Sequence, residues 1–175
     1  MDDQQVLWEK CAAFHGHRCG GLAIGFQAAR LAMELLGTDR AGDEELVCVA
    51  ECDACGVDAI QTVLGCTVGK GNLLFRLRGK QAFSFYHRKS GKSVRLVLRP
   101  RPPMARGKSM DWLLSREPAE LFDCGETPEL APEPARIFRS VVCGKCGETA
   151  AENYIRLEDG VPLCLDCYHE YSRFS

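Results

Sequence analysis

The segment QAFSFYHRKSGKSVRLVL, residues 81–98, decides the fold class. Residues 81–88 and 93–98 are rich in aromatic and β-branched side chains, and the Ser-Gly-Lys at 90–92 between them suits a tight turn. This pattern predicts a β-hairpin. Another strand is expected just before it, at 73–77. Because these strands follow one another without an intervening helix, the sequence favours an α+β fold over an alternating α/β fold.

Helices are predicted ahead of the hairpin, over residues 3–14, 21–36 and 58–64, with a short buried strand at 46–50. Apolar residues of the longest helix recur at spacings of three and four: Leu22, Phe26, Ala29, Met33 and Leu36. Gly37 suits the end of that helix, since glycine readily adopts the left-handed conformation of a C-cap. We therefore expect helices packed on a mostly antiparallel sheet.

Composition places the chain among globular proteins. Its 175 residues are 46% hydrophobic and 26% charged, with a formal net charge of −2. This charge argues against general affinity for nucleic acid or anionic membranes. No apolar run approaches the roughly 18 residues of a membrane span, and the acidic N-terminus is unlike a signal peptide, so we expect a cytoplasmic protein. Among the 11 cysteines, Cys11 and Cys48 lie in apolar settings and are expected in the core.

Three regions are expected along the chain. Residues 1–124 would form a metal-binding α+β domain, 125–138 a linker rich in proline and glutamate, and 139–175 a small zinc ribbon. The prolines of 117–134 are expected to interrupt helices and strands at several points. The last region is too short to fold by hydrophobic burial alone, so it needs a further source of stability.

That source is predicted from four cysteines at the spacing of a structural zinc site: Cys143, Cys146, Cys164 and Cys167. A hairpin turning at 158–160 would bring the two CxxC pairs together, and zinc would contribute on the order of 10 kcal/mol. A redox dithiol pair and a rubredoxin-like iron site are the alternatives. The segment is net acidic, which makes nucleic acid an unlikely partner and favours contact with protein.

The N-terminal domain carries a second constellation, His15-Gly16-His17-Arg18-Cys19. Glycine allows the backbone to fold tightly around a small object such as a metal ion. The segment also opens the predicted helix at 21–36, and a helix N-terminus favours a thiolate that binds metal or acts as a nucleophile. The sequence therefore predicts a metal turn, for zinc or another transition metal.

Further donors are expected from the turns at 51–58 and 65–67. The candidate metal ligands of this domain are His15, His17, Cys19, Cys55 and Cys66. The candidate catalytic residues are Cys19, Asp58 and Lys70. A mixed histidine and cysteine site can keep one position open for water or substrate. An iron–sulfur cluster on Cys19, Cys52, Cys55 and Cys66 is a less favoured alternative.

Three ordered motifs, FHGHRC at 14–19, ECDACGVDAIQ at 51–61 and GCTVGKGNL at 65–73, resemble those of the FmdE family, named after the FmdE subunit of formylmethanofuran dehydrogenase. The resemblance covers about residues 8–100, and the C-terminal cysteine knuckle resembles DksA/TraR zinc fingers. The family's usual Cys-Pro-Gly is replaced here by Cys19-Gly20-Gly21. The resemblance implies an α+β core, a homodimer, a larger redox-enzyme partner and a link to one-carbon or molybdopterin-dependent redox metabolism.

Three classes of function follow from these features. The first is a metal-binding protein with an open site, acting as an accessory subunit or as a metalloenzyme. The second is a non-catalytic, zinc-dependent adaptor whose ribbon recruits a protein partner. The third is a redox thiol sensor, which would require Cys52 and Cys55 to be free of metal. Three protein ligands plus water at the N-terminal site would favour an enzyme, and four protein ligands would favour the adaptor.

Overall fold

The computed structural model describes residues 3–103 and 107–174. The chain divides after Ala135 into two compact units, here called the body and the ribbon. The division places residues 125–135, expected to be part of a linker, with the body. There the Ala135 backbone N–H donates to the Glu44 carboxylate at 2.9 Å.

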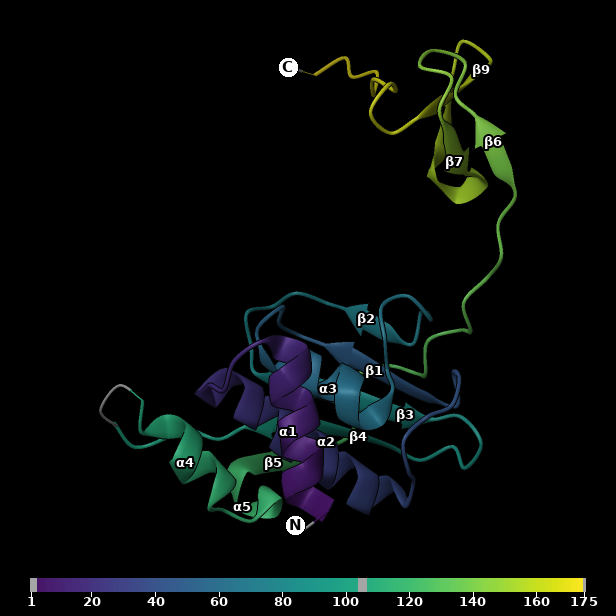
Figure 1. Ribbon diagram of the computed structural model, residues 1–175. Helices are drawn as coiled ribbons and strands as arrows, with labels where there is room; N and C mark the ends of the chain where they lie inside the picture. The colour runs from purple at the N-terminus through teal and green to yellow at the C-terminus, as the bar shows by residue number, and fades with distance from the viewer. Residues whose placement is uncertain (1–2, 104–106, 175) are drawn as a thin grey trace. The chain divides into compact units, whose positions relative to one another are not determined.

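The body is built of helices against one five-stranded sheet (Figure 1). Its helices are α1 Asp3–His15, α2 Gly20–Leu36, α3 Gly56–Leu64, α4 Ser109–Leu114 and α5 Pro118–Leu121. Its strands are β1 Leu46–Ala50, β2 Leu73–Phe75, β3 Ala82–His87, β4 Ser93–Leu98 and β5 Phe122–Gly125. The strand order is β2-β1-β3-β4-β5, with only the β1–β2 pair parallel. The predicted α+β class, with helices on a mostly antiparallel sheet, is confirmed.

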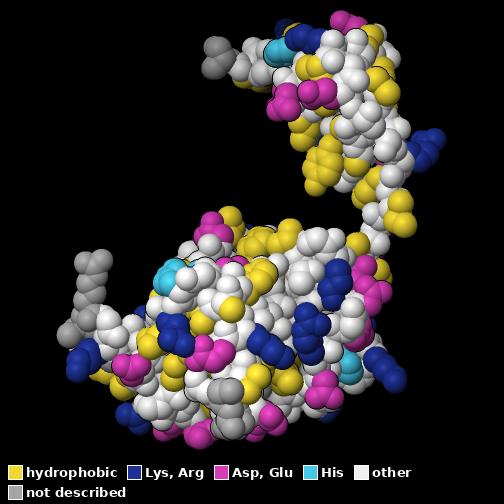
Figure 2. Space-filling model, viewed as in Figure 1, with side chains coloured by type: hydrophobic (Ala, Val, Ile, Leu, Met, Phe, Trp, Pro, Cys, Tyr) yellow, Lys and Arg dark blue, Asp and Glu magenta, His cyan; other side chains and the backbone are white. Residues whose placement is uncertain are grey.

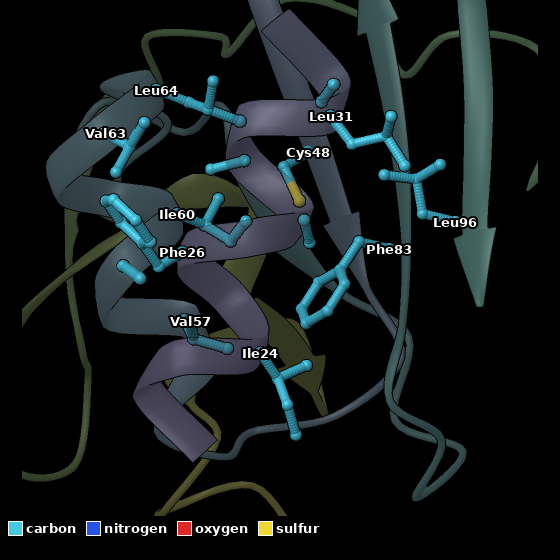
Figure 3. Packing of buried hydrophobic residues seen from close by; sticks show 14 of the residues in the cluster. Ile24, Phe26, Leu31, Cys48, Val57, Ile60, Val63, Leu64, Phe83 and Leu96 are labelled. Carbon is cyan, nitrogen blue, oxygen red and sulfur yellow. The ribbon is translucent and has the colours of Figure 1, made fainter. Parts of the chain in front are cut away.

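Helix α2 lies at the centre of the core. Its predicted apolar face is buried, apart from Met33, which is partly buried. The helix ends at Gly37, whose left-handed conformation (φ 64°) turns the chain so that the next N–H, that of Thr38, reaches the Met33 carbonyl at 3.1 Å. Figure 3 shows Ile24 and Leu31 in the same packed cluster as residues of α3 and the sheet, with the expected core residue Cys48 among them.

The β3–β4 hairpin is confirmed, with Tyr86 opposite Ser93 next to the turn. Because side chains alternate along a strand, β3 presents two different faces. Phe83 and Phe85 belong to the core beneath the helices, whereas Ser84 and Tyr86 lie on the other face of the sheet.

The proline-rich segment contains two elements that were not predicted from the sequence, α5 and β5. The expectation that prolines break helices here was wrong at Pro118, which occupies the first turn of α5. A proline is tolerated there because the first N–H groups of a helix need no intrahelical partner. Glu117 and Glu120 form a capping box around this turn. Strand β5 then pairs with β4 through Phe122 opposite Leu98.

The ribbon consists of two hairpins. Strand β6 Ser140–Val142 pairs with β7 Thr149–Ala151, a 3-10 turn follows at Glu152–Tyr154, and β8 Ile155–Glu158 pairs with β9 Val161–Cys164. The second hairpin turns at the predicted place, with Asp159 and Gly160 at positive φ (50° and 81°). In the described parts of both units, no helix has the length and apolar character needed to cross a bilayer.

Candidate metal centres

The ribbon brings its four cysteines together. Its four sulfur atoms all lie within 4.8 Å of one another; they belong to Cys143, Cys146, Cys164 and Cys167. The Cys146 and Cys164 sulfurs are 3.9 Å apart. A tetrahedral zinc ion with Zn–S bonds of about 2.3 Å requires sulfurs about 3.8 Å apart. The donor set therefore fits zinc and fills all four positions, which is the arrangement of a structural site.

Backbone N–H groups prepare this ribbon centre for a cation. Those of Cys146, Cys164 and Lys145 lower the pKa of Cys143 to about 6. By contrast, burial and the neighbouring thiols raise the pKa of Cys167 to about 12. The cluster thus favours one thiolate but disfavours a second one close to it. A bound cation would remove the repulsion between the thiolates and so stabilise all of them together.

A second group of donors lies at the junction of α1 and α2. It consists of His15, His17 and Cys19, whose ligand atoms lie within 4.8 Å of one another, and it is called here the body centre. His15 is the last residue of α1, and Gly16, at φ 90°, turns the chain there. Cys19 is the N-cap of α2, where its sulfur accepts the Leu22 N–H at 3.3 Å. The two helix ends thus bring His15 Nε2 to 3.8 Å from Cys19 Sγ.

The orientation of His15 is set by a carboxylate. Its Nδ1 lies 2.7 Å from Asp58 Oδ2, so an Nδ1–H donates to the carboxylate and leaves the Nε2 lone pair on the side of Cys19. Gln61 Nε2 donates to the other oxygen of Asp58 at 3.3 Å. This is the usual support of a metal-binding histidine. Asp58, expected as a catalytic candidate, is placed to position a ligand.

Close packing of α2 on α3 brings Cys55 beside this centre. A Cβ atom on Gly25 would lie 1.9 Å from the Gly56 carbonyl oxygen, so glycine alone permits this approach. A Cβ on Gly21 would lie 3.3 Å from Cys55 Sγ and 3.8 Å from Cys19 Sγ. Burial and then the neighbouring Cys19 raise the pKa of Cys55. Cys55 is therefore beside Cys19, outside the group of donor atoms that all lie within 4.8 Å of one another. The glycines four residues apart in α2 are the signal that could have predicted this crossing.

The structure does not bring Cys66 or Lys70 to the body centre. Cys66 follows the C-terminus of α3 whereas Cys55 precedes its N-terminus, and a nine-residue helix is about 13 Å long. The buried Cys66 thiol donates to the Leu46 carbonyl at 3.4 Å, and burial raises its pKa to about 12. Lys70 Nζ donates to the Asp43 carbonyl at 3.1 Å.

Cys52 is also directed elsewhere. Its buried thiol donates to Gln81 Oε1 at 3.8 Å, and burial raises its pKa. With Cys66 at the far end of α3, the four thiols considered for an iron–sulfur cluster do not converge on one point. The body centre instead combines the imidazoles of His15 and His17 with the sulfur of Cys19, and the Cys55 sulfur lies beside Cys19.

Comparisons with known proteins match each of the two units to a known family. The family described as "FmdE, Molybdenum formylmethanofuran dehydrogenase operon" matches residues 14–133, and the prokaryotic DksA/TraR C4-type zinc finger matches residues 136–173. A probable S-adenosyl-L-methionine-binding protein of Archaeoglobus fulgidus is 30% identical over 192 residues. The match covers 90% of this chain but 51% of the relative, so the chain spans about half the length of that protein.

A solved structure extends the likeness to nearly the whole chain. It is the crystal structure of a protein from Syntrophus aciditrophicus that is similar to the FmdE subunit of tungsten formylmethanofuran dehydrogenase. It superposes with a TM-score of 0.68 at 24% identity, and the match covers 94% of this chain and 91% of that one, which shows a shared fold. Since the family match spans well over half of the chain, this is a metal-binding member of the FmdE family that also carries a DksA/TraR-type zinc finger.

Proposed function

We propose that the body centre holds zinc or another first-row transition metal through His15, His17 and Cys19, with one position left for a small molecule. The protein would act as an accessory subunit or a metalloenzyme in one-carbon or molybdopterin-dependent redox metabolism. The observation that carries the proposal is the geometry of His15, whose Nδ1 is held by Asp58 while its Nε2 lies 3.8 Å from Cys19 Sγ.

The spacing of these donors suits one ion. A nitrogen at 2.0–2.1 Å and a sulfur at 2.3 Å from tetrahedral zinc are about 3.6 Å apart, close to the distance between His15 and Cys19. His17 supplies a third donor from the solvent-exposed side, its ring centroid 4.5 Å from that of His15. Three protein donors leave a tetrahedral ion one further position, which is the arrangement of catalytic zinc sites.

Each protein group has a separate role in this arrangement. Asp58 fixes the tautomer and the ring orientation of His15, and the Leu22 N–H stabilises the Cys19 thiolate. A zinc ion, when bound, supplies a Lewis acid that polarises a coordinated oxygen. Cys55 is placed either to serve as a fourth ligand or to line the position where a small molecule binds. S-adenosyl-L-methionine, named in the description of the archaeal relative, is one such molecule to test.

Cobalt substitution tests for an open position. The d–d absorption of cobalt(II) reports its coordination, so azide should change the spectrum of an open site. We expect the full chain to bind two cobalt ions, and azide to alter the contribution of one. Cys19→Ser should lose that response, whereas Cys146→Ser, which affects only the ribbon, should keep it. A spectrum unchanged by azide would contradict an open centre.

The adaptor remains the second candidate because the ribbon exposes apolar side chains, visible in Figure 2. Those exposed include Val142, Tyr154, Leu157 and Val161. Apolar groups on a module held together by metal favour contact with another protein. A closed body centre, unresponsive to azide, would favour this function. A homodimer or a larger redox partner would supply such a contact.

A further inference from the structure

A cavity of about 380 Å³ lies on the face of the body sheet opposite the helix-covered core. Strands β1, β2 and β3 form its floor, and part of segment 128–132 forms its roof. Its volume falls within the range of small-molecule sites, about 300–1,000 Å³. The body centre involves other residues, so this cavity stands independently of the function proposed above.

Two hydroxyl groups in the cavity wall are available to a ligand. Ser84 and Tyr86 project from β3 and are only 3% and 4% exposed. Within the described residues neither hydroxyl forms a hydrogen bond to a protein group, and neither oxygen is sealed off from solvent. Because both residues line the cavity and their hydroxyls bond no protein group, the two hydroxyls are free to hydrogen-bond a molecule bound there.

The charges around the cavity indicate which class of molecule. Glu51 on the floor accepts from Arg95 Nε at 2.6 Å and from Arg95 Nη2 at 2.9 Å, so both carboxylate oxygens are already paired. This neutral pair offers nothing to a cation. The cation that lines the cavity, Arg76, pairs with Glu129 of the roof. Both side chains are open to solvent, at 37% and 55% exposure, so this ion pair can exchange.

We propose that this cavity binds a small organic carboxylate, which replaces the Glu129 carboxylate on Arg76. The Tyr86 and Ser84 hydroxyls hydrogen-bond the polar end of the ligand. Its hydrocarbon part packs against the apolar lining of the cavity: Val49, Leu74, Phe75, Pro128 and Leu130. Glu129 then acts as a competitor built into the chain, occupying the guanidinium until a ligand carboxylate displaces it.

Benzoate and benzamide provide a matched pair of probes, alike in shape and different in charge. Each is titrated into the ¹⁵N-labelled full chain, and the amide shifts of Val49, Ser84 and Tyr86 are followed by NMR. Benzoate should shift these amides, and benzamide should bind at least about tenfold more weakly, since a hydrogen bond to a charged group contributes on the order of tenfold in affinity or more.

Two substitutions should act in opposite directions. Glu129→Gln removes the competing carboxylate and should tighten benzoate binding several-fold, whereas Arg76→Gln should weaken it about tenfold or more. Arg76→Lys keeps the charge but loses the paired geometry, and should lie between wild type and Arg76→Gln. The NMR spectrum of each variant also reports whether it is folded.

Three results would overturn the proposal. One is the absence of any benzoate shift in both wild type and Glu129→Gln. Another is equal binding of benzoate and benzamide, which would show that the cavity does not select a carboxylate. The third is weaker binding by Glu129→Gln, which would show that the roof carboxylate is not displaced.

Discussion

Replacing Asp58 by asparagine should weaken metal binding at the body centre without unfolding the protein. The substitution keeps the size of the side chain, but removes the charge that accepts the His15 Nδ1 hydrogen at 2.7 Å. Asparagine can also present its NH₂ group to Nδ1, which favours the opposite tautomer and takes the Nε2 lone pair away from the metal.

The expected magnitude follows from the role of such supporting groups. Loss of the hydrogen-bond partner of a ligating histidine typically costs 10- to 100-fold in metal affinity, about 1.4–2.7 kcal/mol. The partial exposure of Asp58, 34%, places the effect toward the lower end of this range. We therefore expect a loss of about 10- to 30-fold in zinc affinity at this centre.

Competition with a chromophoric chelator measures this change. Titrations use Cys143→Ser/Cys146→Ser chains, whose ribbon keeps only two cysteines, so that the measured affinity is that of the body centre. Asp53→Asn is the matched control, because it removes the same charge from an exposed position near Cys55. Equal loss of affinity in the two variants would show a general charge effect. No loss in Asp58→Asn would refute the positioning role.

Three further predictions follow from the packing and the charges. Cys146→Ser should remove the ribbon's zinc, so trypsin should cleave residues 136–174 rapidly while the melting of the body is unchanged; an uncut ribbon would show that zinc does not hold it folded. Gly25→Ala should lower the free energy of unfolding by about 1–3 kcal/mol or more, because its Cβ would lie 1.9 Å from the Gly56 carbonyl oxygen. Gly42→Ala, with its nearest neighbour 3.6 Å away, should change chemical denaturation little, and similar losses in the two variants would contradict the packing argument. The hydrogen bonds from Arg95 hold the pKa of Glu51 below its ordinary value of 4.5. The Glu51 carboxylate therefore stabilises the fold fully above pH 4.5, and this stabilisation is lost as the pH falls through the lowered pKa. The stability advantage of wild type over Glu51→Gln should therefore shrink in acid, and an advantage independent of pH would contradict this.

The elements predicted from the sequence are those whose signals are local. The apolar spacing of α2 and its Gly37 cap are contained in one stretch of chain, as is the 90–92 turn of the β3–β4 hairpin. Strand β5 was missed because an edge strand of four residues has little pattern of its own and forms by pairing with β4. Helix α5 is not predicted because a proline more often ends a helix than begins one, and only the capping box around Pro118 distinguishes the two cases.

Predicting the body centre was harder because its parts are far apart in sequence. The three donors within one turn, His15, His17 and Cys19, are brought together as the motif suggested. The motif after β1 and the motif after α3 were both expected to reach them, yet a full helix separates Cys55 from Cys66. The length of α3 alone shows that Cys55 and Cys66 lie far apart. Which of the two lies near Cys19 depends on how α3 crosses α2 at Gly25 and Gly56, and that crossing is a tertiary contact.

The central claim is an open centre with three protein ligands, and X-ray absorption at the zinc edge tests it most directly. The measurement uses the Cys143→Ser/Cys146→Ser chain, whose ribbon keeps only two cysteines, loaded with one zinc so that the signal comes from the body centre. We predict one sulfur at about 2.3 Å and three lighter atoms at about 2.0–2.1 Å, two of them from imidazoles and one from solvent. Two sulfurs and two imidazole nitrogens, with Cys55 as the fourth ligand and no solvent, would contradict the account.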